Sequence, residues 1–404
     1  MTKVGPKDLA ILGGTPAFAS PLHVGRPNVG DRAVLLDRIN DILDRRWFTN
    51  NGFYVQELER RLAELTGARH VIAMANGTVA LEIAIRALDL TGEVILPSMT
   101  FVATAHALQW QQIQPVFCDV DPRTFTLDPN RIAELITPRT TGILGVHLWG
   151  RVCDVEALSE IAVAHGLKLL FDAAHAFHTS HQGRMVGSFG DAEVFSFHAT
   201  KFFNTFEGGA VATNDDELAA KIRLMKNFGF AGYDNVIHIG TNGKMPEISA
   251  AMGLTGLESL EDFVETNRSN YHRYRRELDG LAGVRLWSYP EAERSNYQYI
   301  VLDIDETAAG LSRDDLAAIL WAENVLARRY FYPGCHAMEP YRTLYPEAAG
   351  RLPVTECLVG RTLVLPTGTA VTPAEIGEVC EIVRFALAQG GEIKALMARE
   401  VAYA

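Results

Sequence analysis

The chain has 404 residues, of which 48% are hydrophobic and 21% charged, a balance that excludes disordered, collagen-like and coiled-coil proteins. This length predicts two or three domains around a large buried core. With 37 basic and 49 acidic side chains the formal charge is −12, so we expect no nucleic-acid partner, while a local basic pocket for a small phosphorylated ligand is compatible with that charge.

The start of the chain, residues 1–18, has one short apolar stretch interrupted by glycines and a proline. It therefore lacks the continuous apolar core of a signal peptide, and elsewhere no apolar run approaches the ~20 residues of a membrane helix. Five cysteines are scattered without a CxxC pair, which predicts reduced thiols rather than disulfides or a zinc site. We expect a cytoplasmic protein with no membrane segment and no metal.

Seven short apolar runs alternate with helical patterns from about residue 68. Consecutive apolar positions are typical of strands covered on both faces, and their alternation with helices predicts a mostly parallel α/β sheet. Helical patterns cover 78–88 and 154–166, the second ending at Gly166. The strand candidates are 70–75, 93–97, 115–120, 141–148, 168–174, 193–198 and 209–213.

The pattern changes after about residue 245. We predict that residues 1–250 hold an N-terminal segment and the large α/β domain, and that residues 251–404 hold a linker helix and a small α+β domain. The candidates in the second part are helical stretches at 246–278, 312–323 and 373–388 and strands at 284–287 and 297–304.

Residues that follow the strands are the candidates for chemistry, because ligands of open α/β sheets bind at the carboxyl ends of strands. Asn76-Gly77-Thr78 follows the first strand and opens a helix, where unpaired N–H groups suit a phosphate. The alternative is an ordinary N-cap, and when these three residues are considered by themselves the N-cap is favoured.

Asp172 and Lys201 follow two later strands. A carboxylate at the end of an apolar strand needs a cationic partner, which a protonated pyridine nitrogen or a structural arginine would provide. A lysine among aromatic residues has a lowered amine pKa, as a Schiff-base lysine requires, and a lysine that merely reaches solvent is the common alternative. Ser196, five residues before Lys201, favours the first interpretation because it can bind a phosphate oxygen.

In combination these residues match a site for pyridoxal 5′-phosphate (PLP). This cofactor requires a lysine for covalent attachment, a carboxylate that keeps its ring nitrogen protonated, and a cradle for its phosphate. Phe101, beyond the strand at 93–97, is a candidate for stacking on the ring, and a core position is its alternative.

The chain resembles the DegT/StrS family of sugar aminotransferases, a branch of the fold type I PLP enzymes. The resemblance runs through nearly the whole chain in the family's order and implies the fold of that family, a large domain with a mostly parallel seven-stranded sheet and a small α+β C-terminal domain. The matching segments are WFTNNG (47–52), ANGTVALEIAIRAL (75–88), EVILPSMTFVATAHAL (93–108), PVFCDVDPRTFTLDP (115–129), GVHLWG (145–150), FDAAHAF (171–177), SFHATKFFNTFEGGAVAT (196–213), GTNGKMPEISAAMGL (240–254), FYPGCHAMEPY (331–341) and LVLPTG (363–368).

The resemblance implies three roles at the reacting end of the cofactor. Lys201 would be the Schiff-base lysine and the base that moves the proton between substrate and cofactor. Asp172 would pair with the ring nitrogen, and His175 would lie beside the phenolic oxygen.

It also implies how the rest of the cofactor is held. Gly77, Thr78 and Ser196 would bind the phosphate, and Phe101 would stack on the ring. Asn242 matches a family asparagine that reaches the phosphate of the neighbouring subunit, so a homodimer with shared active sites is expected.

Two positions depart from the family pattern. Phe202-Phe203 follow the lysine, where most members have asparagine directly after it, and Lys244 replaces the usual arginine of the GxNxRM segment. Both changes could alter substrate contacts. Relatives that replaced the lysine with histidine became dehydratases, so the presence of Lys201 implies transamination.

Two stretches around Lys201 and Arg329 are most similar to the subgroup that aminates dTDP-4-keto-6-deoxy-glucose at C4. The resemblance therefore implies a cytoplasmic enzyme that transfers an amino group from L-glutamate to that keto sugar, for antibiotic or surface-polysaccharide sugars. Arg328, Arg329, Tyr330 and His336 are candidates for contacting the sugar nucleotide, with ordinary surface and packing roles as the alternative. An aminotransferase for a 3-keto sugar nucleotide or a cyclitol and a non-catalytic PLP-binding regulator are the other functions compatible with the sequence.

Overall fold

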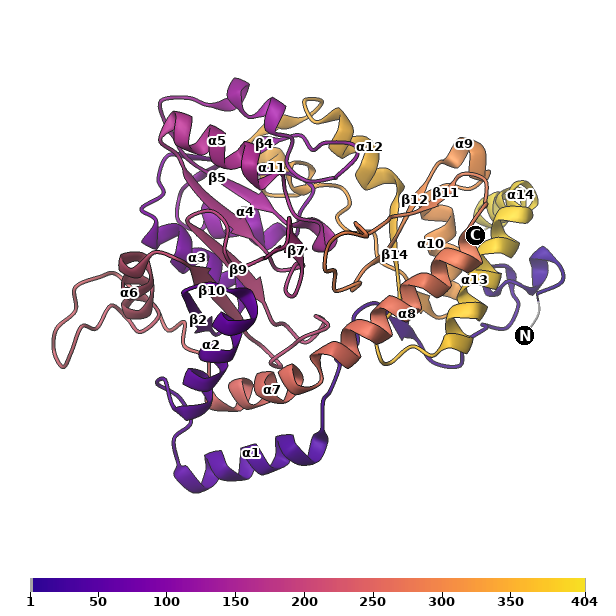
Figure 1. Cartoon of the computed structure of the whole chain (residues 1–404). Coiled ribbons are helices and arrows are strands. Elements are labelled where there is room, and N and C mark those ends of the chain that lie inside the picture. The colour runs from indigo at the N-terminus through magenta and orange to yellow at the C-terminus, as the bar shows by residue number, and fades with distance from the viewer. Residues whose placement is uncertain (1–2, 404) are drawn as a thin grey trace.

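The computed structural model describes residues 3–403, and a seven-stranded sheet lies at its centre (Figure 1). The strand order is β2-β10-β9-β6-β5-β3-β4; β10 runs antiparallel to both its neighbours, and the other pairings are parallel. All seven strands predicted from the sequence belong to this sheet, so the predicted fold class is confirmed. They are β2 (His70–Met74), β3 (Glu93–Pro97), β4 (Gln114–Cys118), β5 (Thr140–Val146), β6 (Lys168–Asp172), β9 (Ala192–Ser196) and β10 (Gly209–Thr213).

The strands are apolar on consecutive positions because helices cover both faces of the sheet. In β2, Ile72 and Met74 pack into one hydrophobic cluster, whereas Val71 and Ala73 pack into another. The first cluster is completed by α3 (Gly77–Ala87), α4 (Val102–Gln109) and α6 (Asp216–Met225), and the second by α2 (Phe53–Thr66), α5 (Val155–His165) and α7 (Glu247–Glu258).

The C-terminal part of the chain forms a smaller antiparallel sheet with its own core. Figure 1 shows α8 running from α7 beside the large sheet to this second part. Ile300, Leu316 and Val383 belong to its hydrophobic cluster. The sheet has the order β11-β12-β14, and its elements are α8 (Leu260–Leu278), β11 (Val284–Leu286), β12 (Ile300–Ile304), α10 (Arg313–Ala322), β14 (Thr362–Leu365) and α13 (Pro373–Ala388).

The start of the chain packs on this smaller part. Leu9 and Phe18 lie in the same hydrophobic cluster as the small sheet, and β1 (Leu22–His23) pairs in parallel with β13 (Val325–Leu326). Residues 9–23 therefore share a core with the C-terminal part, although the predicted division assigned them to the segment 1–250. The boundary between the two domains stays a prediction.

The remaining helices and short strands lie outside these two sheets. Within residues 3–403, no helix combines the length and the apolar character needed to cross a membrane. The elements are α1 (Arg32–Arg45), β7 (Ser180–His181), β8 (Arg184–Met185), α9 (Glu306–Ala309), α11 (Tyr341–Leu344), α12 (Pro353–Arg361) and α14 (Gly390–Tyr403).

Candidate active site

A cavity of about 830 Å³ lies at the carboxyl ends of the parallel strands, where the small sheet meets the large one. Asp172 ends β6, Ser196 ends β9, and the loop after β9 carries Lys201. Most of the residues that the sequence singled out line this one cavity. They include Gly77, Thr78, Phe101, Asp172, His175, Ser196, Lys201, Arg328 and Tyr330.

The loop that carries Lys201 is anchored in the core by the two residues that follow the lysine. Phe202 and Phe203 are buried in the hydrophobic cluster beneath the sheet, which gives these departures from the family pattern a packing role. The Lys201 amine donates a hydrogen bond to the hydroxyl of Tyr299 at 3.2 Å. Burial lowers the pKa of Lys201 to about 8, and the nearby carboxylate of Asp172 opposes that fall. About a tenth of the amine is therefore uncharged at pH 7, far more than for a lysine in water.

Asp172 is buried at the end of β6 with both of its carboxylate oxygens engaged. The Thr104 hydroxyl donates to Oδ2 at 2.8 Å, and the N–H of Ala174 donates to Oδ1 at 3.0 Å. Burial raises the pKa of Asp172, and these two donors together with the amine of Lys201 partly offset the rise. A cationic group in the cavity would favour the charged form of this carboxylate.

The N-terminus of α3 forms one wall of the cavity. The Asn76 side chain caps the helix by accepting the N–H of Val79 at 2.9 Å. Within the described chain, the N–H groups of Gly77 and Thr78 have no acceptor, so they are free for a ligand. A Cβ at Gly77 would lie 3.0 Å from the Cβ of Ser196 and 3.3 Å from its hydroxyl oxygen. The glycine therefore keeps open the space where an anion would meet the helix and Ser196.

His175 and two phenylalanines form an aromatic wall. Burial lowers the pKa of His175 well below its ordinary value, so its ring is neutral, and Nδ1 accepts the N–H of Trp149 at 3.3 Å. The proton of the neutral ring then lies on Nε2, which can donate. The His175 ring is parallel to that of Phe331, with 5.7 Å between their centroids. Phe101 remains 55% exposed, so its ring face is available to a flat ligand.

Four basic side chains and the acidic Glu207 line the outer part of the cavity. His23, Arg26, His198 and Arg328 all line it. Arg26 donates to the Pro21 carbonyl at 3.2 Å, and the Arg328 guanidinium lies 5.4 Å from the centroid of the Tyr330 ring. Among the described residues, neither arginine has a carboxylate partner, so both are available to an anionic ligand.

Three predicted site residues do not line the cavity. Asn242 accepts a hydrogen bond from the amine of Lys244 at 2.7 Å, on the part of the chain that follows α6. Arg329 pairs with Asp314 at 2.9 Å. His336 is buried, with its Nδ1 2.6 Å from the hydroxyl of Ser98, and it belongs to the packing behind the cavity. The predicted roles of these residues toward a sugar nucleotide or a partner subunit stay predictions.

Three residues in or next to the cavity were not found from the sequence. Thr104 and Tyr299 contact the proposed catalytic pair, and Arg26 lines the mouth. Thr104 lies inside a helical pattern, and Tyr299 precedes an apolar strand, so each looks like an ordinary packing residue. Only the way in which the chain folds brings them next to Asp172 and Lys201.

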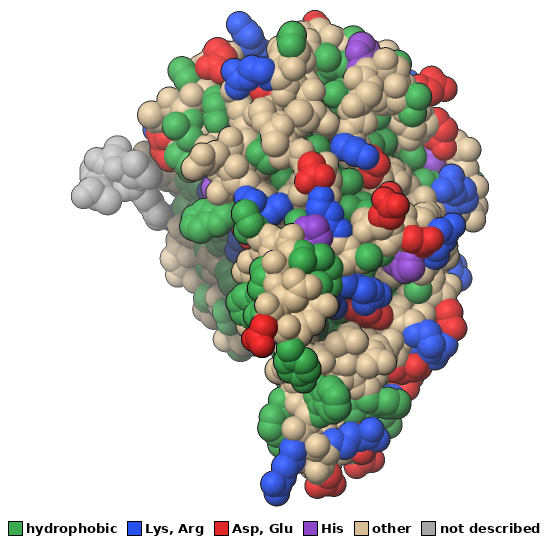
Figure 2. Space-filling view, turned by 90° about the vertical axis from the view of Figure 1, so that its left-hand side faces the viewer, with side chains coloured by type: hydrophobic (Ala, Val, Ile, Leu, Met, Phe, Trp, Pro, Cys, Tyr) green, Lys and Arg blue, Asp and Glu red, His purple; other side chains and the backbone are tan. Residues whose placement is uncertain are grey.

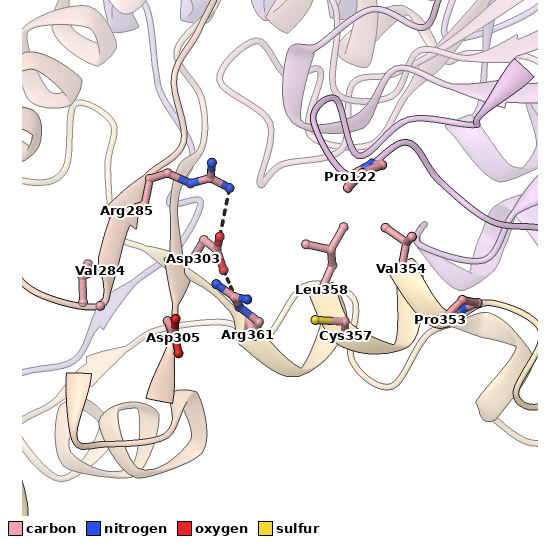
Figure 3. A pocket seen from close by; sticks show the side chains of 11 residues that line it. Pro122, Val284, Arg285, Asp303, Asp305, Pro353, Val354, Cys357, Leu358 and Arg361 are labelled. Atoms are coloured by element: carbon pink, nitrogen blue, oxygen red, sulfur yellow. Dashed lines mark hydrogen bonds and ion pairs between the residues drawn. The ribbon is translucent and has the colours of Figure 1, made fainter. Parts of the chain in front are cut away.

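A second cavity of about 630 Å³ lies between the small sheet and α12. Figure 3 shows Arg285 and Arg361 pointing at Asp303 from two sides. Their distances to the Asp303 carboxylate are 3.0 Å and 2.9 Å, so one buried carboxylate holds both guanidinium groups. This arrangement is a structural ion-pair network, and the chemistry belongs to the cavity at Lys201.

Exposed apolar side chains gather on a different face. Figure 2 looks at the left-hand side of Figure 1, where α6 and the long loop after it project, and it shows hydrophobic side chains over the middle and lower part of this face. Exposed apolar side chains gathered in this way are typical of a surface that another protein covers. The exposed hydrophobic residues of α1, of residues 47–53 and of residues 228–248 are Leu36, Leu43, Trp47, Phe48, Phe53, Phe228, Phe230, Tyr233, Val236, Ile237, Ile239 and Ile248.

Comparison with known proteins agrees with this geometry. The sequence model of the DegT/DnrJ/EryC1/StrS aminotransferase family matches residues 31–384. A dTDP-4-amino-4,6-dideoxy-D-glucose transaminase of Shigella dysenteriae is 42% identical over 313 residues, which are 78% of this chain and 85% of the relative. The Escherichia coli protein of the same name is 36% identical over 351 residues, 86% of this chain and 94% of the relative. The crystal structure of DesI in the presence of its TDP-sugar product is 48% identical, has a TM-score of 0.92, and covers 97% of this chain and 99% of its own.

Proposed function

Because the chain belongs to the DegT/DnrJ/EryC1/StrS aminotransferase family, as the sequence predicted, we propose that it transfers an amino group from L-glutamate to a dTDP-4-keto-6-deoxy-hexose. The amino group would be placed on C4 and give dTDP-4-amino-4,6-dideoxy-glucose, the compound named in the two relatives at 42% and 36% identity. The five free cysteines support a reducing compartment, the cytoplasm.

The observation that carries the proposal is the meeting of Lys201, Asp172 and the start of α3 in one cavity. We propose PLP as the cofactor, because a partly uncharged amine, a buried carboxylate and a helix N-terminus kept open by Gly77 fit its aldehyde, ring nitrogen and phosphate. When bound, PLP supplies an aldehyde that takes up nitrogen and a ring that draws electrons from the carbon losing its proton.

The side chains of this chain supply the remaining parts of the reaction. Lys201 would attach the cofactor and, once free, take a proton from one carbon and return it to another. Asp172 would keep the ring nitrogen protonated, because an opposite charge within hydrogen-bond range favours the cationic form. His175, neutral with its proton on Nε2, would donate to the phenolic oxygen, and Phe101 would cover a face of the ring.

Two arginines at the mouth of the cavity support a sugar nucleotide as the amino acceptor. Arg26 and Arg328 lack carboxylate partners among the described residues and line the same cavity as Lys201, so two guanidinium groups are available to the diphosphate. Tyr330 lines the same region and offers a flat surface. The alternatives predicted from the sequence, a 3-keto sugar nucleotide or a cyclitol, remain substrates to be compared.

We also propose a homodimer in which each site uses residues of both chains. Asn242 lies outside the cavity of its own chain, on the segment that carries many of the exposed apolar residues in Figure 2. A second copy covering this surface would bring Asn242 toward the phosphate site of its partner, and a two-fold axis would repeat the arrangement at both sites.

The test is an assay of the purified, PLP-loaded protein with L-glutamate and a panel of keto sugar nucleotides. We expect turnover with dTDP-4-keto-6-deoxy-glucose and, by NMR of the product, an amine at C4. Lys201→Ala should abolish turnover, whereas Lys221→Ala, which removes only an exposed ion pair with Asp89, should leave it unchanged. Amination at C3, or an absorbance spectrum that does not respond to glutamate, would contradict the proposal and favour one of the alternatives.

A further inference from the structure

Tyr299 lies where the small sheet reaches the cavity, and its hydroxyl contacts the amine of Lys201. The amine donates a hydrogen bond to the hydroxyl at 3.2 Å. The Tyr299 side chain is buried, and its ring lies 4.7 Å from that of His175. Tyr299 directly precedes β12, so the small sheet brings a hydroxyl to an amine that the large sheet presents.

The backbone of Tyr299 is held by one side chain. The Tyr289 hydroxyl accepts the N–H of Tyr299 at 3.0 Å and donates to its carbonyl at 2.9 Å. Tyr289 is itself buried, so this clamp is shielded from water. With both of its backbone groups engaged, Tyr299 has a defined position next to the amine.

The loop before Tyr299 is also tied to the large sheet. The amide of the fully buried Asn296 donates to the carbonyls of His175 at 2.9 Å and Phe177 at 3.0 Å. Lys201, by contrast, carries its amine on a flexible four-carbon stem. The fixed partner in this pair is therefore the tyrosine.

We propose that Tyr299 is a positioning residue whose hydroxyl holds the Lys201 amine, whenever that amine is not bonded to the cofactor, in the place from which the amine moves a proton. The inference rests on the proposed function in that Lys201 is the group that transfers the proton. The amine takes up one proton from the reacting carbon and returns it to a neighbouring carbon, so neither side chain is consumed.

The hydroxyl acts as a neutral partner in this role. Burial raises the pKa of Tyr299 well above its ordinary value, so the hydroxyl does not ionise and cannot serve as the base. Its oxygen accepts from the charged ammonium, and its O–H can donate to the neutral amine. Because a charge-assisted hydrogen bond is about twice as strong as a neutral one, the tyrosine favours the ammonium form.

The first test needs neither sugar nor cofactor. Tyr299→Phe keeps the ring beside His175 and removes only the hydroxyl. Acylation of Lys201 by sulfosuccinimidyl acetate in the cofactor-free protein, followed against pH by mass spectrometry, reports the titration of the amine. Loss of the acceptor should move the midpoint down by roughly half to one pH unit. Tyr297→Phe, which removes a hydroxyl two residues earlier from a ring packed on Tyr289, is the matched control and should leave the midpoint in place.

The second test uses the PLP-loaded enzyme. Tyr299→Phe should retain PLP and slow its reaction with glutamate by roughly tenfold to hundredfold. The kinetic isotope effect with glutamate deuterated at C2 should rise, because proton transfer then limits the rate more strongly. A purely structural role would leave this isotope effect unchanged.

A folded Tyr299→Phe protein with an unchanged acylation midpoint and isotope effect would overturn the proposal. If that variant does not fold, Tyr289→Phe takes its place, since it leaves the Tyr299 hydroxyl and removes only its clamp, and it must move both readouts in the same directions. A wild-type protein that aminates no keto sugar, while Tyr299→Phe still lowers the acylation midpoint, would refute the proposed substrate and support the contact between Tyr299 and Lys201.

Discussion

Lys201 has its unusual amine because the residues around it exclude water. Phe202 and Phe203 pack into the core next to it, and burial lowers the pKa of the amine to about 8, while Asp172 limits that shift. The same burial raises the pKa of Asp172. Each group therefore favours the charged form of the other. A cation bound at Asp172 would further stabilise its carboxylate.

The first prediction at this scale concerns covalent attachment. Lys201→Ala should bind PLP only non-covalently and lose turnover by roughly a thousandfold or more, since both attachment and proton transfer depend on this amine. Borohydride reduction of the loaded wild-type protein followed by peptide mapping checks the assignment. A label on any lysine other than Lys201 would show that it is wrong.

The second prediction concerns the carboxylate. Asp172→Asn should keep PLP but transaminate at least about tenfold more slowly, because loss of the opposite charge lowers the pKa of the ring nitrogen by about 1–3 units. The asparagine oxygen can still accept the N–H of Ala174 and its NH2 can donate to the Thr104 hydroxyl, so the fold should persist. Near wild-type rates in this variant would place the essential carboxylate elsewhere.

The third prediction is a pH dependence. A lowered lysine pKa means that the neutral amine dominates above pH 8 rather than above the ordinary value of about 10.4. The rate at which PLP attaches to the cofactor-free protein should therefore rise with pH and level off above about 8. In Asp172→Asn the levelling should occur at lower pH, because the carboxylate raises the Lys201 pKa. A rate that continues to rise past pH 10 would contradict the buried state of the amine.

At the scale of elements, the prediction concerns the start of α3, where one added carbon atom should weaken the binding of PLP. Gly77→Ala would put a Cβ 3.0 Å from the Cβ of Ser196, inside the space kept for the phosphate. PLP affinity should fall by about tenfold to hundredfold, because the added carbon weakens one or more hydrogen bonds to the charged phosphate. A fluorescence titration with PLP measures it.

Gly360→Ala is the matched control for this change. Gly360 lies in α12, where an added Cβ meets no atom within 4 Å, so its replacement should leave PLP affinity unchanged. Equal affinities in the two variants would mean that the phosphate is bound elsewhere.

At the scale of the whole molecule, the prediction concerns assembly. Lys201→Ala and Asn242→Ala subunits should each be impaired alone, but a mixture that exchanges subunits should recover up to about a quarter of wild-type activity, because half of the dimers are hybrids with one intact site out of two. Analytical ultracentrifugation should give a dimer. An active monomer, or an Asn242→Ala protein with unchanged PLP affinity, would contradict the shared site.

Much of the fold and of the site could be predicted from local patterns. The seven strands of the large sheet and the helices at 154–166 and 373–388 were predicted within a few residues, because strands covered on both faces are apolar at consecutive positions and helices end at recognisable caps. The family was also predicted, and the match over residues 31–384 confirms it. Since ligands meet such sheets at strand ends, the sequence by itself was enough to place Asp172, Ser196 and Lys201 in one cavity.

Which distant residues contact one another was decided by the tertiary structure, because no local pattern contains this information. Thr104 and Asp172 lie 68 positions apart in the sequence, and Lys201 and Tyr299 lie 98 apart, yet each pair shares a hydrogen bond. Leu9 and Phe18 pack into the C-terminal core, and His336 contacts Ser98 behind the cavity. The physical reason is the same in each case: periodicity reports whether a side chain is buried, whereas its partner is set by which elements pack together, and that depends on the whole chain.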